Sequence, residues 1–108
     1  MEKYQLKINS INQTVNYFDG QYCTNNMGKW EELKSKIFIS DSLTDEVKFQ
    51  TIIHELCHIF FRNSGLRDGD DEERIVQGMS IQMYDFIINN RNFIVDMINN
   101  SAKNENNS

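Results

Sequence analysis

The segment from residue 44 to residue 62 has the hydrophobic period of an amphipathic α-helix, and it contains both histidines of the chain. At 100° per residue, one side of this helix gathers large apolar side chains, namely Phe49, Ile52, Ile53, Leu56, Ile59 and Phe60. The opposite side carries His54, Glu55 and His58. Because a histidine that only fills a core would lie within the apolar stripe, this placement favours a functional role for both histidines.

His54 and His58 have the spacing that lets two imidazoles bind one metal ion. Residues four apart on a helix lie about 5 to 6 Å from each other at Cβ, close enough to share a tetrahedral ion. Glu55 follows the first histidine, where a carboxylate can take a proton from the water that the metal activates. Zn²⁺ fits such a site because it accepts imidazole and carboxylate ligands and has no redox chemistry. The HExxH pattern therefore predicts a zinc site in which Glu55 is the catalytic base for hydrolysis of an amide bond.

A catalytic zinc site needs a third protein ligand, and the chain has no further histidine. Cys57 neighbours His58 and points about 100° away from it on the helix, which excludes it. Cys23 stays open, although nothing around it resembles a ligand. The main candidates are Glu72 and Glu73, at the start of the next helical segment. Periodicity slightly favours Glu72, which falls at the centre of that helix's apolar face, and the other glutamate is expected to serve only the helix dipole.

The segments before the histidine helix are typical of β-structure. Residues 4–8 alternate in hydrophobicity, residues 14–18 are β-branched and aromatic, and the Asp19-Gly20 pair predicts a turn after them. Residues 30–33 predict one helical turn, and residues 36–40 predict a buried or half-buried strand. The N-cap candidates that follow are Asp41, Ser42 and Thr44, and Gly65 suits the left-handed position at the end of the helix.

The C-terminal half predicts further helices. A helix should begin at about Asp70 or Asp71 and reach Asn89, followed by a short helix at residues 93–98 and a disordered polar tail at residues 101–108. The predicted fold class is therefore α+β. A small N-terminal antiparallel sheet packs on the histidine helix and on one or two C-terminal helices, within a single domain over residues 1–100.

Composition limits the partners of the chain. With 108 residues, of which 39% are hydrophobic, it can bury one modest core. A net charge of −5 opposes sequence-independent contact with phosphates, so we expect no direct binding of nucleic acid. The N-terminal residues lack the apolar run of a signal peptide, and no stretch approaches the roughly 18 apolar residues of a membrane span. Two cysteines are too few for a disulfide scaffold. We therefore expect a cytoplasmic domain without a membrane partner.

KIFISDSLTDEVKFQTIIHELCHIFF, followed by DEERIVQGMS, resembles the small ImmA/IrrE-type metallopeptidases of phages, prophages and other mobile elements. The resemblance covers residues 37–90, about half of the chain. In that family a strand leads into a helix with HExxH, and a glutamate on the following helix completes a gluzincin-like zinc site. What the resemblance implies for the fold is a minimal zincin-like core.

The register of the family pattern decides between the two glutamates. Glu73 is followed by Val76, Gln77 and Ser80 at the positions that the family pattern requires, whereas Glu72 would put Val76 in a polar position. The resemblance thus implies Glu73 as the third ligand, with Glu72 as the alternative. Gln77 and Ser80 depart from the usual Asn and Ala, but neither change removes a ligand.

The function that the resemblance implies is a zinc-dependent peptidase of a phage or mobile element, active in the bacterial host cell on a regulatory protein such as a repressor. Residues 36–40 are expected to offer a strand edge to an extended substrate. Tyr22, Arg62 and Tyr84 are candidate stabilisers of the oxyanion.

Two alternatives belong to other classes. One is a zinc-binding interaction module without turnover, which docks a partner through its acidic surface or through the stripe of Met79, Met83 and Phe86. The other is a structural phage protein with a vestigial motif. The intact Glu55 favours the peptidase, because a purely structural zinc site needs no carboxylate beside its ligands.

Overall fold

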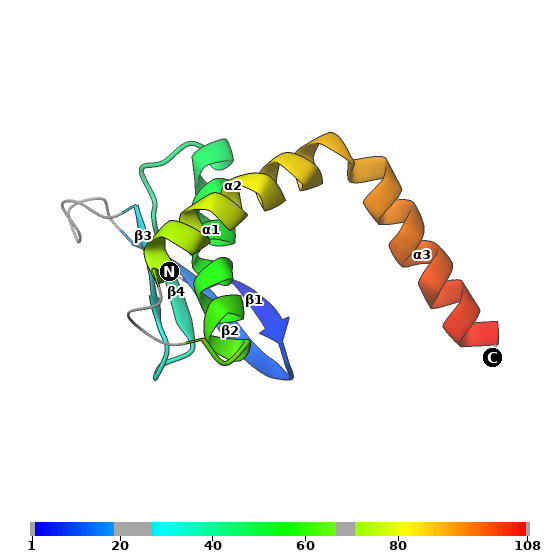
Figure 1. Cartoon of the computed structure of the whole chain (residues 1–108), viewed down its shortest axis with the longest axis horizontal. Coiled ribbons are helices and arrows are strands. Elements are labelled where there is room, and N and C mark those ends of the chain that lie inside the picture. The colour runs from blue at the N-terminus through cyan, green and yellow to red at the C-terminus, as the bar shows by residue number, and fades with distance from the viewer. Residues whose placement is uncertain (1, 19–26, 67–70, 108) are drawn as a thin grey trace.

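The computed structural model describes residues 2–18, 27–66 and 71–107. Within these residues, four strands come first: β1 (Glu2–Ile8), β2 (Ile11–Phe18), β3 (Gly28–Glu31) and β4 (Lys36–Ser40). Three helices follow: α1 (Asp45–Asn63), α2 (Glu72–Asn89) and α3 (Arg91–Asn107). The predicted α+β class, with a small sheet followed by helices, is confirmed (Figure 1).

The four strands form one sheet in the order β1-β2-β4-β3. β1 and β2 are a hairpin whose two turn residues, Asn9 and Ser10, have φ values of 50° and 68°. Positive φ at both positions is the mark of a type I′ turn, which matches the twist of a hairpin. β4 pairs with β2 in parallel and with β3 in antiparallel orientation. The sheet is therefore mixed, whereas the sequence predicted an antiparallel sheet. β3 is an edge strand of the sheet, and β4 lies between β2 and β3 and pairs with both.

The helical turn expected at residues 30–33 is wrong, because Trp30 and Glu31 belong to strand β3. Trp30 packs against the core, and its Nε1–H donates a hydrogen bond to Oε1 of Gln13 at 3.2 Å. Pairing with β4 therefore overrides the local helical signal. The strand expected at residues 36–40 is confirmed as β4. The turn expected at residues 19 and 20 lies outside the described residues.

Helix α1 begins and ends close to where its caps predict. Among the N-cap candidates it is Thr44 that caps the helix, since its hydroxyl accepts a hydrogen bond from the backbone N–H of Val47 at 3.3 Å. Ser64 is the C-cap, and Gly65 follows with a φ of 84°, in the left-handed region that glycine tolerates.

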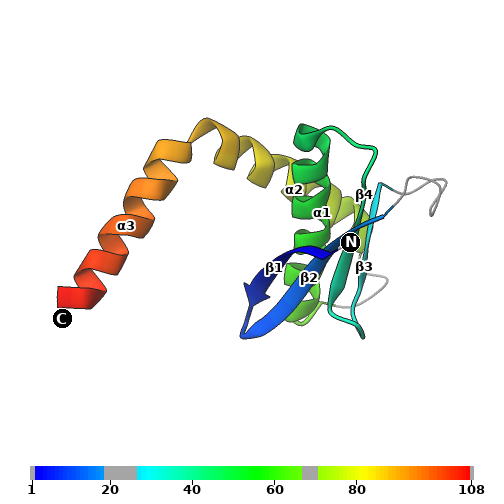
Figure 2. The ribbon, with the colours of Figure 1, turned by 180° about the vertical axis from the view of Figure 1, so that it is seen from behind.

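Two faces of α1 are buried, because the helix lies between the sheet and α2 (Figures 1 and 2). One core cluster joins α1 to the sheet and consists of Val15, Ile37, Ile39 and Ile59. The other joins α1 to α2 and consists of Ile53, Cys57, Phe61 and Val76. The single apolar stripe predicted for α1 is therefore wrong in its centre. Phe49 and Phe60, which lie between the two buried faces, stay 38% and 37% exposed.

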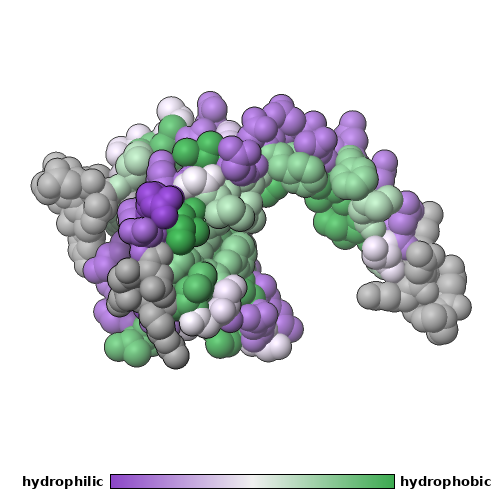
Figure 3. Space-filling view, viewed as in Figure 1, coloured by the Kyte–Doolittle hydropathy of each residue, from purple (hydrophilic) through white to green (hydrophobic). Residues whose placement is uncertain are grey.

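Helix α3 extends away from the rest of the chain, and among the described elements it contacts only α2 (Figures 1 and 2). Its backbone is helical from Arg91 to Asn107, so the short helix predicted at 93–98 is wrong in its length. The disordered tail at 101–108 stays a prediction. The segment contains no proline or glycine that would stop a helix once it has started. Hydrophobic side chains gather on the concave side of the arm that α2 and α3 form (Figure 3). None of the described helices is long and apolar enough to cross a membrane.

Candidate metal centre

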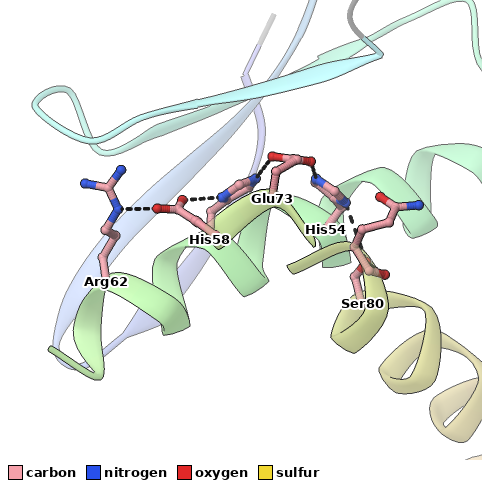
Figure 4. Close-up of polar contacts among 7 residues, drawn as sticks. His54, His58, Arg62, Glu73 and Ser80 are labelled. Carbon is pink, nitrogen blue, oxygen red and sulfur yellow. Dashed lines mark hydrogen bonds and ion pairs between the residues drawn. The ribbon is translucent and has the colours of Figure 1, made fainter. Parts of the chain in front are cut away.

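His54 and His58 lie one turn apart on α1, and their ring centroids are 5.1 Å from each other. Both side chains are only partly exposed, at 21% for His54 and 15% for His58. They lie on the part of α1 that the first turns of α2 cross (Figure 4). The i and i+4 spacing has therefore brought the two imidazoles to one place, as the sequence predicts.

Glu73, in the first turn of α2, lies between the two imidazoles (Figure 4). Its Oε1 is 2.9 Å from Nε2 of His54, and its Oε2 is 3.1 Å from Nε2 of His58. One ligand atom from each of the three side chains lies within 4.8 Å of the others. His54, His58 and Glu73 form a group that could hold a metal ion.

The two nitrogen–oxygen distances of this group, each to a different oxygen of Glu73, are close to those expected around a small tetrahedral ion. Ligand atoms at 2.0 to 2.2 Å from such an ion lie about 3.4 Å from each other, and the two nitrogen–oxygen distances here are only slightly shorter. A nitrogen lone pair and a carboxylate oxygen repel each other at 2.9 to 3.1 Å unless a proton or a metal ion lies between them. A proton on the imidazole or a bound metal ion accounts equally for these short distances, so the group is one that could hold a metal ion.

Glu72, the other candidate for the third ligand, has a different place. Its Oε2 lies 2.5 Å from Nδ1 of His58, and its Oε1 accepts a hydrogen bond from Nε of Arg62 at 2.9 Å. Burial acts to raise the pKa of the Glu72 carboxyl, but the hydrogen bonds from His58 and Arg62 outweigh it and hold the pKa below its usual range. Both glutamates thus reach α1, one at each edge of the His58 ring, and the group of candidate ligands contains Glu73.

Ser80 supports His54 from α2, and the sequence analysis gave it no role. The Ser80 hydroxyl donates to the carbonyl of Gln77 at 3.1 Å, which turns its lone pairs towards Nδ1 of His54, 3.5 Å away (Figure 4). Seven residues separate Ser80 from Glu73, about two helical turns, so both lie on one face of α2. That spacing was the signal in the sequence from which the contact could have been inferred.

Glu55 is buried beside the candidate ligands and is itself outside the group. It is 7% exposed and lines the pocket described below. Burial raises the pKa of the Glu55 carboxyl above its usual range, while the nearby His58 and His54 offset part of the effect. A carboxylate with a raised pKa next to a metal position is suited to receive a proton.

An open pocket of about 730 Å³ gives access to these residues. Its walls include the candidate ligands, Glu55, and residues 27–30 in and next to β3. Gly28 lets β3 approach α1 closely, since a Cβ at this position would lie 2.6 Å from Cγ2 of Thr51, one turn before His54. The pocket therefore lies between the edge strand of the sheet and the two helices that carry the candidate ligands.

The structure does not single out an oxyanion stabiliser among the three candidates. Arg62 holds Glu72 through Nε, and Tyr84 lies edge-on against Phe49 with ring centroids 5.6 Å apart, although both residues line the pocket. Tyr22 lies outside the described residues. The structure assigns the oxyanion role to none of the described candidates.

Cys57 does not join the candidate ligands. Cys57 is buried on the α2 side of α1, where its Sγ–H donates to Sδ of Met83 at 3.4 Å, as its orientation relative to His58 predicts. Burial raises the pKa of the Cys57 thiol, which disfavours the thiolate that a metal would bind. Cys23 lies outside the described residues.

Comparison of the chain with protein-family models, with curated proteins and with solved structures gives no match.

Proposed function

We propose that this chain is a zinc-dependent metallopeptidase that hydrolyses protein or peptide bonds. The observation that carries the proposal is the position of Glu55, a buried carboxylate at the pocket beside three side chains that could hold a metal ion. A site that only needed a metal for stability would gain nothing from burying a further carboxylate next to its ligands. The HExxH pattern and the resemblance to ImmA/IrrE-type peptidases support the same activity.

Zinc is the metal that suits this set of donors. Two imidazole nitrogens and one carboxylate oxygen are the ligands of gluzincin-like catalytic sites, and the remaining coordination position stays open. Bound at His54, His58 and Glu73, zinc would supply Lewis-acid polarisation of the scissile carbonyl and make water acidic enough to lose a proton near neutral pH.

The proton transfers in this proposal belong to Glu55. Its carboxylate accepts a proton from the attacking water and then gives that proton to the amine that leaves. Its raised pKa helps the first transfer, because a more basic carboxylate binds the proton more firmly. The walls of the pocket reduce the contact of Glu55 with bulk water, so that the proton is held for the second transfer.

The substrate would lie along β3, which corrects the expectation for residues 36–40. Strand β4 lies between β2 and β3 and has no open edge, whereas β3 is an outer strand of the sheet. Residues 27–30 line the pocket, so a peptide that pairs with β3 in extended form would pass the candidate ligands. We include in the proposal that the gene belongs to a phage or mobile element and that the substrate is a regulatory protein, as the resemblance implies.

A digest of a peptide library, read by mass spectrometry, tests the activity. The zinc-loaded protein should produce cleavage products that a chelator abolishes and added zinc restores. Glu55→Gln is the matched variant, because it should keep the zinc and lose about 10² to 10⁴ of the hydrolytic rate. Equal cleavage by the parent and by Glu55→Gln would show that the products come from a contaminating protease or from another base.

An interaction module that binds zinc without turnover is the second candidate. It is favoured by the exposure of Met79 and Phe86 on α2, at 55% and 51%, whereas Met83 of the same predicted stripe packs against α1. A zinc-loaded protein that cleaves nothing in the library, and whose Glu55→Gln variant binds zinc as the parent does, would favour this second function.

A further inference from the structure

The carboxylate of Glu72 joins two side chains of α1 at the edge of the candidate metal centre. Oε2 accepts from Nδ1–H of His58 at 2.5 Å, and Oε1 accepts from Nε–H of Arg62 at 2.9 Å (Figure 4). The Glu72 side chain is only 13% exposed, so water competes little for these hydrogen bonds. Arg62 lies one turn after His58 on α1, and the guanidinium fixes the carboxylate from the side away from the imidazole.

The hydrogen bond to Glu72 decides which nitrogen of His58 is available to a metal. A neutral imidazole has one N–H and one lone pair, and an acceptor at Nδ1 keeps the proton there. The lone pair is then on Nε2, the nitrogen that faces Glu73 at 3.1 Å. His54 has a weaker arrangement of the same kind, because its Nδ1 faces the neutral hydroxyl of Ser80 at 3.5 Å.

We propose that Glu72 is a positioning residue, which holds the His58 imidazole with Nε2 towards the metal and is itself held by Arg62. The inference rests on the proposed zinc site and adds a role that neither the HExxH pattern nor the third ligand explains. The two consecutive glutamates of α2 then have separate tasks: Glu73 binds the metal, and Glu72 orients the ligand beside it.

The contacts of Glu72 with His58 and Arg62 go beyond a role in the helix dipole, as a comparison with the preceding residue shows. Asp71 is an exposed acid at the same helix end, and it pairs with Arg74 of its own helix at 3.2 Å. Asp71 is the N-cap of α2, has a φ of 58° and makes no side-chain cap hydrogen bond. Its side chain therefore does not hold the first turn of α2 by capping. Glu72 and Glu73 instead bind that turn to α1 through the two histidines and Arg62.

Competitive titration of zinc against a chromophoric chelator tests the proposal on the full chain. Glu72→Gln should weaken zinc affinity about 10- to 100-fold, as is typical when the partner that orients a metal ligand is lost. Glu73→Gln should weaken it further, because it removes a ligand. Asp71→Asn is the matched control, which removes a negative charge from the same helix end, and it should bind zinc as the parent does.

The outcomes separate three roles for Glu72. Parent affinity in Glu72→Gln would overturn the proposal. Loss of zinc as complete as in Glu73→Gln would overturn it too, because Glu72 would then be a ligand. Circular dichroism confirms that each variant is folded during the titration, and should Glu72→Gln not fold, Arg62→Met tests the same imidazole with Glu72 in place.

Cobalt and a double variant provide readouts that a merely structural role would not change. The visible absorption bands of Co²⁺ should differ from those of the parent in Glu72→Gln and stay unchanged in Asp71→Asn, since the bands report on ligand geometry. Arg62→Met should weaken zinc binding less than Glu72→Gln, and the double variant should be no weaker than Glu72→Gln alone. Additive losses, or unchanged cobalt bands, would overturn the proposal. These measurements need no substrate, so a failure to find hydrolysis leaves their result standing.

Discussion

Replacing Glu55 with glutamine should stabilise the metal-free protein, although it removes the proposed catalytic base. Glu55 is 7% exposed, and burial is the largest cause of the raised pKa of its carboxyl, so folding disfavours the charged form. Glutamine has nearly the same shape and carries no charge. We expect a gain on the order of 1 kcal/mol in the free energy of unfolding, which raises the melting temperature by about 5 °C for a chain of this size.

The gain should depend on pH in a defined direction. Because burial raises the pKa of the folded Glu55 above its ordinary value of 4.5, the charged form is disfavoured in the folded state. The destabilisation is fully present above the folded pKa and disappears as the pH falls below the unfolded value near 4.5. The advantage of Glu55→Gln should therefore be largest at pH 8 and vanish towards pH 4. Bound zinc should also reduce it, since a nearby cation stabilises the carboxylate.

Thermal unfolding of chelator-treated protein, followed by circular dichroism between pH 4 and pH 8, measures this effect. Glu46→Gln is the control, because Glu46 is an exposed glutamate in the first turn of the same helix and its removal should not stabilise the protein. A Glu55→Gln variant that melts at or below the parent at pH 8, or whose advantage grows as the pH falls, would refute the reasoning.

Three further predictions concern the two histidines, Gly28 and Cys57. His54→Ala and His58→Ala should each abolish tight zinc binding by metal analysis, and retention of zinc by either would remove that histidine from the site. Gly28→Ala should cost about 1 to 3 kcal/mol in urea unfolding, because its Cβ would lie 2.6 Å from Cγ2 of Thr51, and Thr51→Ser should recover part of the loss. Cys57 is 5% exposed with a raised pKa, so mass spectrometry should find it unmodified by a thiol reagent until the protein unfolds. Rapid modification of the folded protein would contradict its burial.

The local patterns of the sequence predicted the elements that carry the site. Caps, periodicity and the spacing of His54 and His58 are local properties, so the histidine helix, strand 36–40 and the helix after it could be inferred from the sequence. Two features depend on contacts between residues that are distant in sequence. One is the parallel pairing of β2 with β4, and the other is the strand structure of residues 30 and 31. Neither leaves a local signal.

The choice between Glu72 and Glu73 shows where periodicity is insufficient. A helical wheel distinguishes an apolar side from a polar side, and both glutamates lie where α2 crosses α1. Which carboxylate meets Nε2 and which meets Nδ1 depends on the rotation of α2 about its axis and on Arg62, a residue of the other helix. The register of the family pattern that the sequence resembles favours Glu73, and the group that the structure brings together contains the same residue. Ser80 was missed because its contact with His54 also spans the two helices.

Zinc X-ray absorption spectroscopy on protein loaded with one equivalent of the metal tests most directly whether His54, His58 and Glu73 hold zinc. The account predicts a first shell of nitrogen and oxygen at about 2.0 to 2.2 Å, with the multiple scattering of two imidazoles and no sulfur at about 2.3 Å. The Glu73→Gln variant should lose this shell, and Asp71→Asn should keep it. A shell that contains sulfur, a single imidazole, or an unchanged spectrum in Glu73→Gln would contradict the account.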